Sequence, residues 1–144
     1  MRILWLLNIC PPAAAEALGV EYSVREGWIT GALNRYLCAK DEPADVSAHT
    51  LEIGLCFPFE GADGELSCVR RLYPMTDAGK GTGRETALYG FREDLKRPEL
   101  YEDGLEKRFA GILADFKPDL VHIFGTEFPH ALAMVRAFQK PERT

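Results

Sequence analysis

The sequence contains no apolar run that approaches the ~18 residues needed for a transmembrane helix. It also lacks an excess of basic side chains, because 17 Lys and Arg stand against 22 Asp and Glu in 144 residues. Nucleic acids and anionic membranes are bound largely through Lys and Arg, so this balance argues against a general surface for either. We therefore expect no nucleic-acid partner.

The cysteines are few and far apart, with no Cys-x-x-Cys pair and no histidine cluster at metal-ligand spacing. We expect no metal site, and we expect Cys10, Cys38, Cys56 and Cys68 to be reduced thiols. Disulfides are an alternative, but a chain of this length can bury enough apolar surface to fold without them. The expected location is the cytoplasm.

The amino terminus has two interpretations. The apolar run of residues 3–10 and the small residues 13–15 imitate a secretory signal peptide. However, the run is short, contains Asn8 and continues into Pro11-Pro12. We therefore favour a buried first strand over residues 3–7.

Further elements follow from hydrophobic periodicity. Apolar residues at helical spacing predict helices over about 28–39, 103–116 and 126–138, and a helical turn fits 13–18. Alternation or short apolar runs predict strands over 49–57, 66–73 and 119–124, the first two as a hairpin or a crossover pair. The segment 77–98 is polar and Gly-rich, and we expect most of it to be a loop without core contacts.

Local signals predict how the last two helices begin. Asp103 and Glu106 have the spacing of a capping box, and Thr126 can cap the last helix with Pro129 in its first turn. The buried face of this helix is expected to carry four apolar residues, which are Phe128, Leu132, Val135 and Phe138.

The order of these elements predicts a single α/β domain over residues 1–144, with a mainly parallel sheet, helices on both faces and the first strand central. Ligands bind such sheets outside the carboxyl ends of the strands, where the strand order reverses. Here those ends are residues 8–12 and 124–130. An incomplete sheet would leave an exposed edge, at which we expect self-association or a covering segment.

Several residues near these ends can bind a ligand. Gly27 begins a helix and would let a phosphate approach its backbone N–H groups, although glycine there is also typical of a plain turn. Trp28 is either a core residue or a stacking surface. His122 is either a buried histidine with a satisfied hydrogen bond or a ligand contact. The glycine-rich residues 79–83 lack the spacing of a phosphate-binding loop.

Thr126, Glu127 and His130 follow the last strand, where side chains project toward the crevice. Thr126 and Glu127 can also serve only the helix, as a cap and as a charge that complements its dipole.

Residues 1–5 (MRILW), the Pro11-Pro12 loop, the Gly27-Trp28 helix start and above all residues 117–130 (KPDLVHIFGTEFPH) resemble a known family. It is the amino-terminal domain of family 4 (group 1) glycosyltransferases of the GT-B fold, found in capsule and exopolysaccharide synthesis. The resemblance covers both ends of the chain well and residues 58–100 poorly. Two positions depart from it: Glu26 stands where many members have a first glycine, and Phe124 where many have a second histidine.

The resemblance implies a Rossmann-like domain that holds the acceptor side of a cleft. The complete enzyme would transfer a sugar from a nucleotide-sugar donor to an acceptor hydroxyl, with retention and without a metal or cofactor. A carboxyl-terminal domain, absent here, would bind most of the donor and carry a Glu-x7-Glu motif, which we do not expect in this chain. This chain alone should be inactive.

The resemblance also implies roles and partners. Glu127 and His130 are the candidate catalytic residues, and the candidate substrate-binding residues are Asn8, Gly27, Trp28, His122 and Thr126. The expected partners are the nucleotide sugar, a carbohydrate or lipid-linked acceptor and the carboxyl-terminal domain of the same enzyme, in the cytoplasm or at the inner face of the membrane. The alternative is a non-catalytic α/β module that binds a small ligand or a partner protein.

Overall fold

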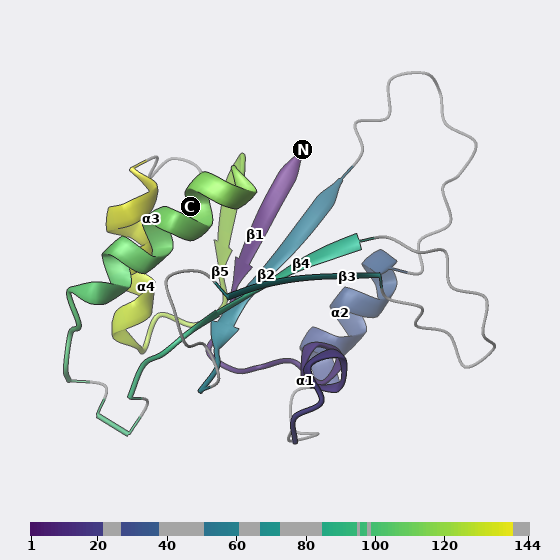
Figure 1. Cartoon of the computed structure of the whole chain (residues 1–144), viewed down its shortest axis with the longest axis horizontal. Coiled ribbons are helices and arrows are strands. Elements are labelled where there is room, and N and C mark those ends of the chain that lie inside the picture. Colours follow the sequence, from purple (N-terminus) through teal and green to yellow (C-terminus); the bar gives the residue numbers. More distant parts are fainter. Residues whose placement is uncertain are drawn as a thin grey trace.

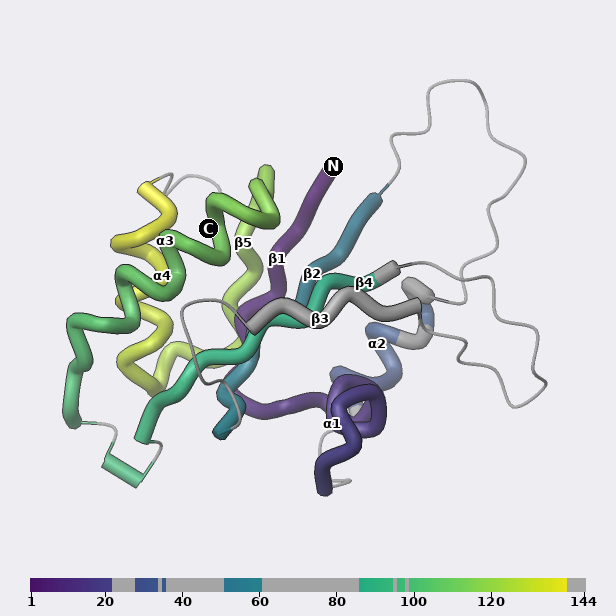
Figure 2. Tube along the Cα trace, viewed as in Figure 1, coloured from purple at the N-terminus to yellow at the C-terminus, as the bar shows by residue number. Residues whose placement is uncertain are grey.

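The computed structural model describes residues 1–21, 27–37, 51–60, 67–72, 85–94, 96–97 and 99–139. In this part of the chain, the strands form a sheet and the helices pack against it (Figures 1 and 2). In chain order the elements are β1 (Arg2–Leu6), α1 (Pro12–Leu18), α2 (Gly27–Leu37), β2 (Glu52–Pro58), β3 (Ser67–Leu72), β4 (Glu85–Phe91), α3 (Gly104–Phe116), β5 (Leu120–Ile123) and α4 (Pro129–Phe138). None of the described helices combines the length and apolar content that a membrane crossing requires.

Within the described residues, the sheet has five strands in the order β3-β4-β2-β1-β5. β1 lies between β2 and β5 and runs parallel to both, and β4 runs parallel to β2 on its other side. β3 is antiparallel to β4. The predicted α/β, Rossmann-like sheet is therefore confirmed, with the first strand inside it and the strand around Val121 next to it.

Helices cover both faces of this sheet (Figure 1). Leu4 and Leu6 are fully buried in a cluster with side chains of α3 and α4. Leu55 and Phe57 are buried on the other face, in a cluster that includes Ile29 of α2 and residues of α1. Strands covered in this way need apolar side chains on both faces, which explains their nearly continuous apolar runs.

Residues 85–91 form β4, so the expectation of a loop over 77–98 is wrong for this stretch. Residues 86–91 are buried, and β4 lies between β2 and β3. β2 and β3 therefore do not form a hairpin. The apolar run Ala87-Leu88-Tyr89-Gly90-Phe91 is a strand buried on both faces, but its polar, glycine-rich surroundings conceal it. Residues 79–83 lie outside the described residues.

α3 has the predicted apolar face, with Leu105, Phe109, Ile112 and Phe116 buried. The predicted capping box does not form, because Asp103 has a helical backbone conformation and makes no side-chain capping bond. Glu106 instead accepts a hydrogen bond from the Tyr101 hydroxyl and pairs with Arg136 at 3.2 Å. The partners of this carboxylate thus come from outside the first turn.

α4 begins at Pro129, three residues after the predicted start at 126; Pro129 lies in the first turn as predicted, but the N-cap is Phe128 and no side chain caps the helix. The expected cap by Thr126 is therefore wrong. The predicted buried face is also wrong in part, since Leu132 is 48% exposed. The helix packs through His130, Met134 and Phe138, spaced four residues apart, together with Ala131 and Ala133.

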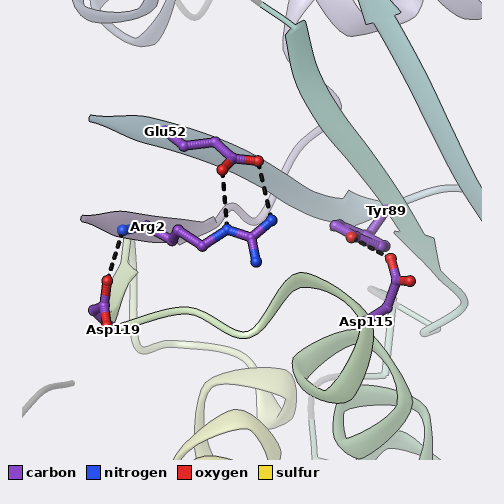
Figure 3. Close-up of polar contacts among 5 residues, drawn as sticks. All are labelled: Arg2, Glu52, Tyr89, Asp115 and Asp119. Atoms are coloured by element: carbon purple, nitrogen blue, oxygen red, sulfur yellow. Dashed lines mark hydrogen bonds and ion pairs between the residues drawn. The ribbon is translucent and has the colours of Figure 1, made fainter. Parts of the chain in front are cut away.

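At the amino end of the sheet, Arg2 connects β1 to its neighbours (Figure 3). Its Nε donates to Glu52 Oε2 at 2.9 Å, and its backbone N–H donates to Asp119 Oδ2 at 2.8 Å. Hydrogen bonding to Glu52 raises the pKa of the Arg2 guanidinium. Nearby, the Tyr89 hydroxyl donates to Asp115 Oδ2 at 2.6 Å. Asp119, the third residue of the Lys-Pro-Asp sequence, therefore has a structural role here.

Gly54 lets α3 lie directly against β2. A Cβ atom at this position would lie 2.9–3.1 Å from three atoms of the buried Phe116 ring. We expect Gly54→Ala to lower the free energy of unfolding by about 1–3 kcal/mol, because the ring must shift within a packed core. Urea denaturation measures this change.

Gly31→Ala is the matched control, since an added Cβ at this exposed position of α2 meets no atom within 4 Å. It should stabilise the protein by about 0.5–1 kcal/mol through helix propensity. Equal unfolding midpoints for the two variants would contradict the packing described here.

Candidate functional site

The strand order places a switch point between β1 and β5. After β1 the chain continues into α1 and α2 on one face of the sheet, and after β5 it continues into α4 on the other face. Chain segments that leave adjacent parallel strands in opposite directions open a crevice at the carboxyl ends of those strands. This is the edge to which the sequence assigned residues 8–12 and 124–130.

Two of the predicted site residues meet at this edge. Asn8 follows β1, Glu127 follows β5, and the Asn8 Nδ2 donates a hydrogen bond to Glu127 Oε1 at 2.7 Å. The Glu127 side chain is exposed, so its second carboxylate oxygen can accept hydrogen bonds from a ligand. The amide and the carboxylate together offer both a donor and acceptors to a polar ligand.

Gly125 leaves the space that the Glu127 carboxylate occupies. Gly125 was not predicted from the sequence as a site residue. It has a φ of +91°, and a Cβ there would lie 2.6–3.1 Å from the Glu127 carboxyl group. The left-handed backbone favours glycine here, and a Cβ would displace the Glu127 carboxyl group from this position. The available signal was a glycine placed directly after a buried strand and two residues before an acidic side chain.

Trp5, Trp28, His122 and Phe124 form an aromatic group next to this edge. The Phe124 ring is stacked on His122, with centroids 4.1 Å apart, and it also contacts Trp5 at 5.1 Å and Trp28 at 5.4 Å. His122 is exposed, so the alternative of a buried core histidine is wrong. Trp28 is 57% exposed and is a surface residue, not a core residue.

His130 is held in the interior. It is 1% exposed, its Nδ1 bonds to Glu93 Oε2, and its backbone N–H donates to Glu93 Oε1 at 3.0 Å. The Glu93 side chain is itself 2% exposed. Phe91 and Phe128 pack their rings against the imidazole. Glu93 therefore fastens the first turn of α4 to the chain that leaves β4. The sequence missed Glu93 because it lies in the segment expected to be a loop.

The other two predicted site residues, Gly27 and Thr126, have contacts that say less about a ligand. Gly27 begins α2, as predicted, and its neighbour Trp28 brings that helix end to Phe124. Thr126 is exposed in the turn between β5 and α4. Of the predicted residues, the structure thus joins Asn8 to Glu127 directly and places Trp28 and His122 around one phenylalanine.

The Glu-x7-Glu spacing, which we did not expect in this chain, occurs twice. Glu52 and Glu85 are the first residues of β2 and β4, and Glu60 and Glu93 lie two residues beyond the ends of these strands. Each strand spans about 20 Å, so the members of each pair cannot form one acidic site. Among the described residues, no group of three His, Cys, Asp or Glu side chains could hold a metal ion.

The buried pair of Glu93 and His130 leads to a stability prediction. Glu93→Ala removes both hydrogen bonds and leaves His130 buried without its partner. We expect a loss of about 3–5 kcal/mol in the free energy of unfolding, measured by urea denaturation.

Glu106→Ala breaks the pair between Glu106 of α3 and Arg136 of α4, whose side chains are 40% and 54% exposed, and is the control. It should cost far less, because solvent already screens that pair. If both variants unfolded at the same urea concentration, the Glu93–His130 pair would not be an anchor of α4.

The comparisons with known proteins add no relative to these observations. No protein-family model matches the chain, and no curated protein or solved structure matches it either. The geometry of the switch point and the residue pattern around it are therefore the basis for assigning a function.

Proposed function

We propose that residues 1–144 form the amino-terminal, acceptor-side half of a retaining GT-B glycosyltransferase of family 4. The complete enzyme would transfer a sugar from a nucleotide-sugar donor to a hydroxyl of a carbohydrate or lipid-linked acceptor in polysaccharide synthesis. The observation that carries this proposal is the contact of Asn8 and Glu127 at the switch point between β1 and β5.

Two independent arguments favour this edge. The switch-point rule selects it from the strand order alone. The sequence of residues 117–130, which resembles the family, supplies β5, the turn after it and the first turn of α4. Thr126 and Glu127, near the carboxyl end of that segment, are exposed at this switch point, which supports a role in holding the acceptor.

Four of the candidate residues have a proposed role. The exposed Glu127 carboxylate holds or deprotonates the acceptor hydroxyl, and Asn8 fixes the orientation of that carboxylate. Gly27 leaves the amino end of α2 open to the donor diphosphate, where helix N–H groups favour an anion. His130 is too buried to touch an acceptor as placed, so it acts by holding the first turn of α4 in position.

The proposal also implies partners and a location. β5 is an edge of the described sheet, and its outer backbone groups can pair with a later strand of the same enzyme or with a second copy. We expect the protein to act in the cytoplasm or at the inner face of the membrane, where nucleotide sugars meet lipid-linked acceptors.

A non-catalytic α/β binding module is the second candidate. The exposure of Trp28 beside the switch point favours it, because such a surface can hold a ligand without chemistry. The two functions differ in one respect: only the transferase couples binding at this edge to the breakdown of a nucleotide sugar.

We expect no sugar transfer by the 144-residue chain alone. Positioning of two reactants supplies roughly 7–11 kcal/mol of a barrier, and half of a cleft cannot hold both substrates. The test is to read the coding frame beyond Thr144 and to produce the complete protein that it encodes. Both proteins are then assayed with radiolabelled nucleotide sugars and membrane acceptors. Equal transfer by both proteins would contradict the division of the site. No transfer by either would favour the binding module.

In the complete enzyme, Glu127→Gln should lower kcat about 10²–10⁴-fold if the carboxylate handles a proton. The amide oxygen can still accept the Asn8 hydrogen bond, so the melting temperature should stay close to that of the parent. Glu16→Gln, at an exposed position of α1, is the control and should change neither quantity. Unchanged turnover in Glu127→Gln would assign this residue to the scaffold.

A further inference from the structure

A notch of about 380 Å³ lies between the carboxyl ends of α3 and α4, beside the turn that leads into β5. Its lining residues come from the stretches 113–119 and 137–138. Asn8 and Glu127 follow the carboxyl ends of two parallel strands, whereas the notch precedes β5, so it lies at the opposite end of the sheet. Small-molecule pockets usually measure about 300–1,000 Å³, so the notch is large enough for a small ligand.

The floor of the notch is apolar. Pro118 and Phe138 are buried, Leu113 and Ala137 are half-buried, and Ala114 is exposed. The two alanines are small, so they leave room that a larger side chain on either helix would fill. An apolar ligand group that enters this space removes its own surface and that of the floor from water, which favours binding.

The rim carries two opposite charges, Lys117 and Asp119, and both side chains are exposed. Within the described part of the chain, the Lys117 ammonium has no hydrogen-bond or ion-pair partner. Lys117 also ends α3 with a φ of +53°, a conformation in which glycine is the usual residue, so a charged side chain is kept here at a backbone cost. Asp119 Oδ2 accepts the Arg2 backbone N–H at 2.8 Å (Figure 3), and the two oxygens of a carboxylate can accept further hydrogen bonds.

The two helix ends add a negative potential to the notch. The last four carbonyls of an α-helix have no partner within the helix, and this end of the helix dipole favours a cation. A ligand with a carboxylate alone would be attracted by Lys117 but repelled by Asp119 and by both helix ends. A ligand with an ammonium alone would be repelled by Lys117. A ligand that carries both charges avoids both penalties.

We infer that this notch binds a small zwitterion with an apolar side chain, namely a free α-amino acid such as leucine or phenylalanine. The carboxylate of the ligand pairs with Lys117, its ammonium donates to Asp119 and to carbonyls at the helix ends, and its side chain covers the apolar floor. These groups lie at the other end of β5 from Glu127, so binding here is independent of the proposed sugar transfer.

The test is a titration of the 144-residue chain with leucine and with phenylalanine, followed in two-dimensional amide NMR spectra. We expect saturable shifts at residues 113–119 and 137–138. Three analogues of leucine each lack one feature: glycine lacks the side chain, 4-methylpentanoate the ammonium and 3-methylbutylamine the carboxylate. Each should bind about 10-fold more weakly or worse, because a charged hydrogen bond or the apolar contact is lost.

Two results of this titration would overturn the inference. The first is the absence of saturable shifts at these residues with both amino acids. The second is an affinity for 4-methylpentanoate or 3-methylbutylamine equal to that for leucine, which would make the notch a site for a single charge.

Variants assign the binding to the notch. Ala114→Leu fills it and should abolish the saturable shifts, whereas Ala110→Leu, at an exposed position one turn earlier on α3, should bind as the parent does. Lys117→Met removes the ammonium and should weaken binding about 10-fold or more. Lys107→Met, also on α3, is its control. Melting temperatures close to that of the parent show that the variants are folded. An affinity for leucine in Lys117→Met equal to that of the parent would overturn the inference.

Discussion

β1 pairs in parallel on both of its sides, and this pairing constrains the rest of the fold. Parallel neighbours cannot be joined by a hairpin, so the chain must leave the carboxyl end of β1 and return to the amino end of β2 through helices. The connection from β4 to β5 crosses the sheet in the other direction, through α3. The two crossovers occupy opposite faces because both are right-handed. The switch point between β1 and β5 is a consequence of this geometry.

The elements that the sequence predicts well are those whose signal is local and repeated. α3 has five apolar residues at the predicted helical spacing, and four of them are buried while Leu113 is half-buried. The prediction of a capping box was wrong because Glu106 bonds to Tyr101 and Arg136 instead. Arg136 is 30 residues away in the sequence, so local spacing does not reveal this contact. The prediction of a loop over β4 was wrong for a similar reason. The burial of β4 depends on β2 and β3 on either side, and its own short apolar run does not identify it as a strand.

In the candidate site, too, features with a local sequence signal could be predicted and features that depend on distant contacts could not. Asn8 and Glu127 could be assigned to one edge because each follows a predicted strand, but their direct contact depends on the turn at Gly125. His122 could not be distinguished from a core histidine, because its exposure follows from the position of β5 at the edge of the described sheet. The role of Glu93 could not be predicted from the sequence, because Glu93 contacts His130 only when the chain after β4 and the first turn of α4 lie together.

The anchoring of Arg2 also determines how the protein can be handled. Its backbone N–H and side chain bond to Asp119 and Glu52, and the Met1 carbonyl accepts from the Glu52 N–H at 2.9 Å. The first residues are thus fixed at the amino end of β1, marked N in Figure 1, whereas Asn8 and Glu127 follow the carboxyl ends of β1 and β5. An affinity tag or a surface linker attached at Met1 would leave the molecule from the side opposite the crevice. Immobilised in this way, the domain would present its carboxyl-end edge to the solution.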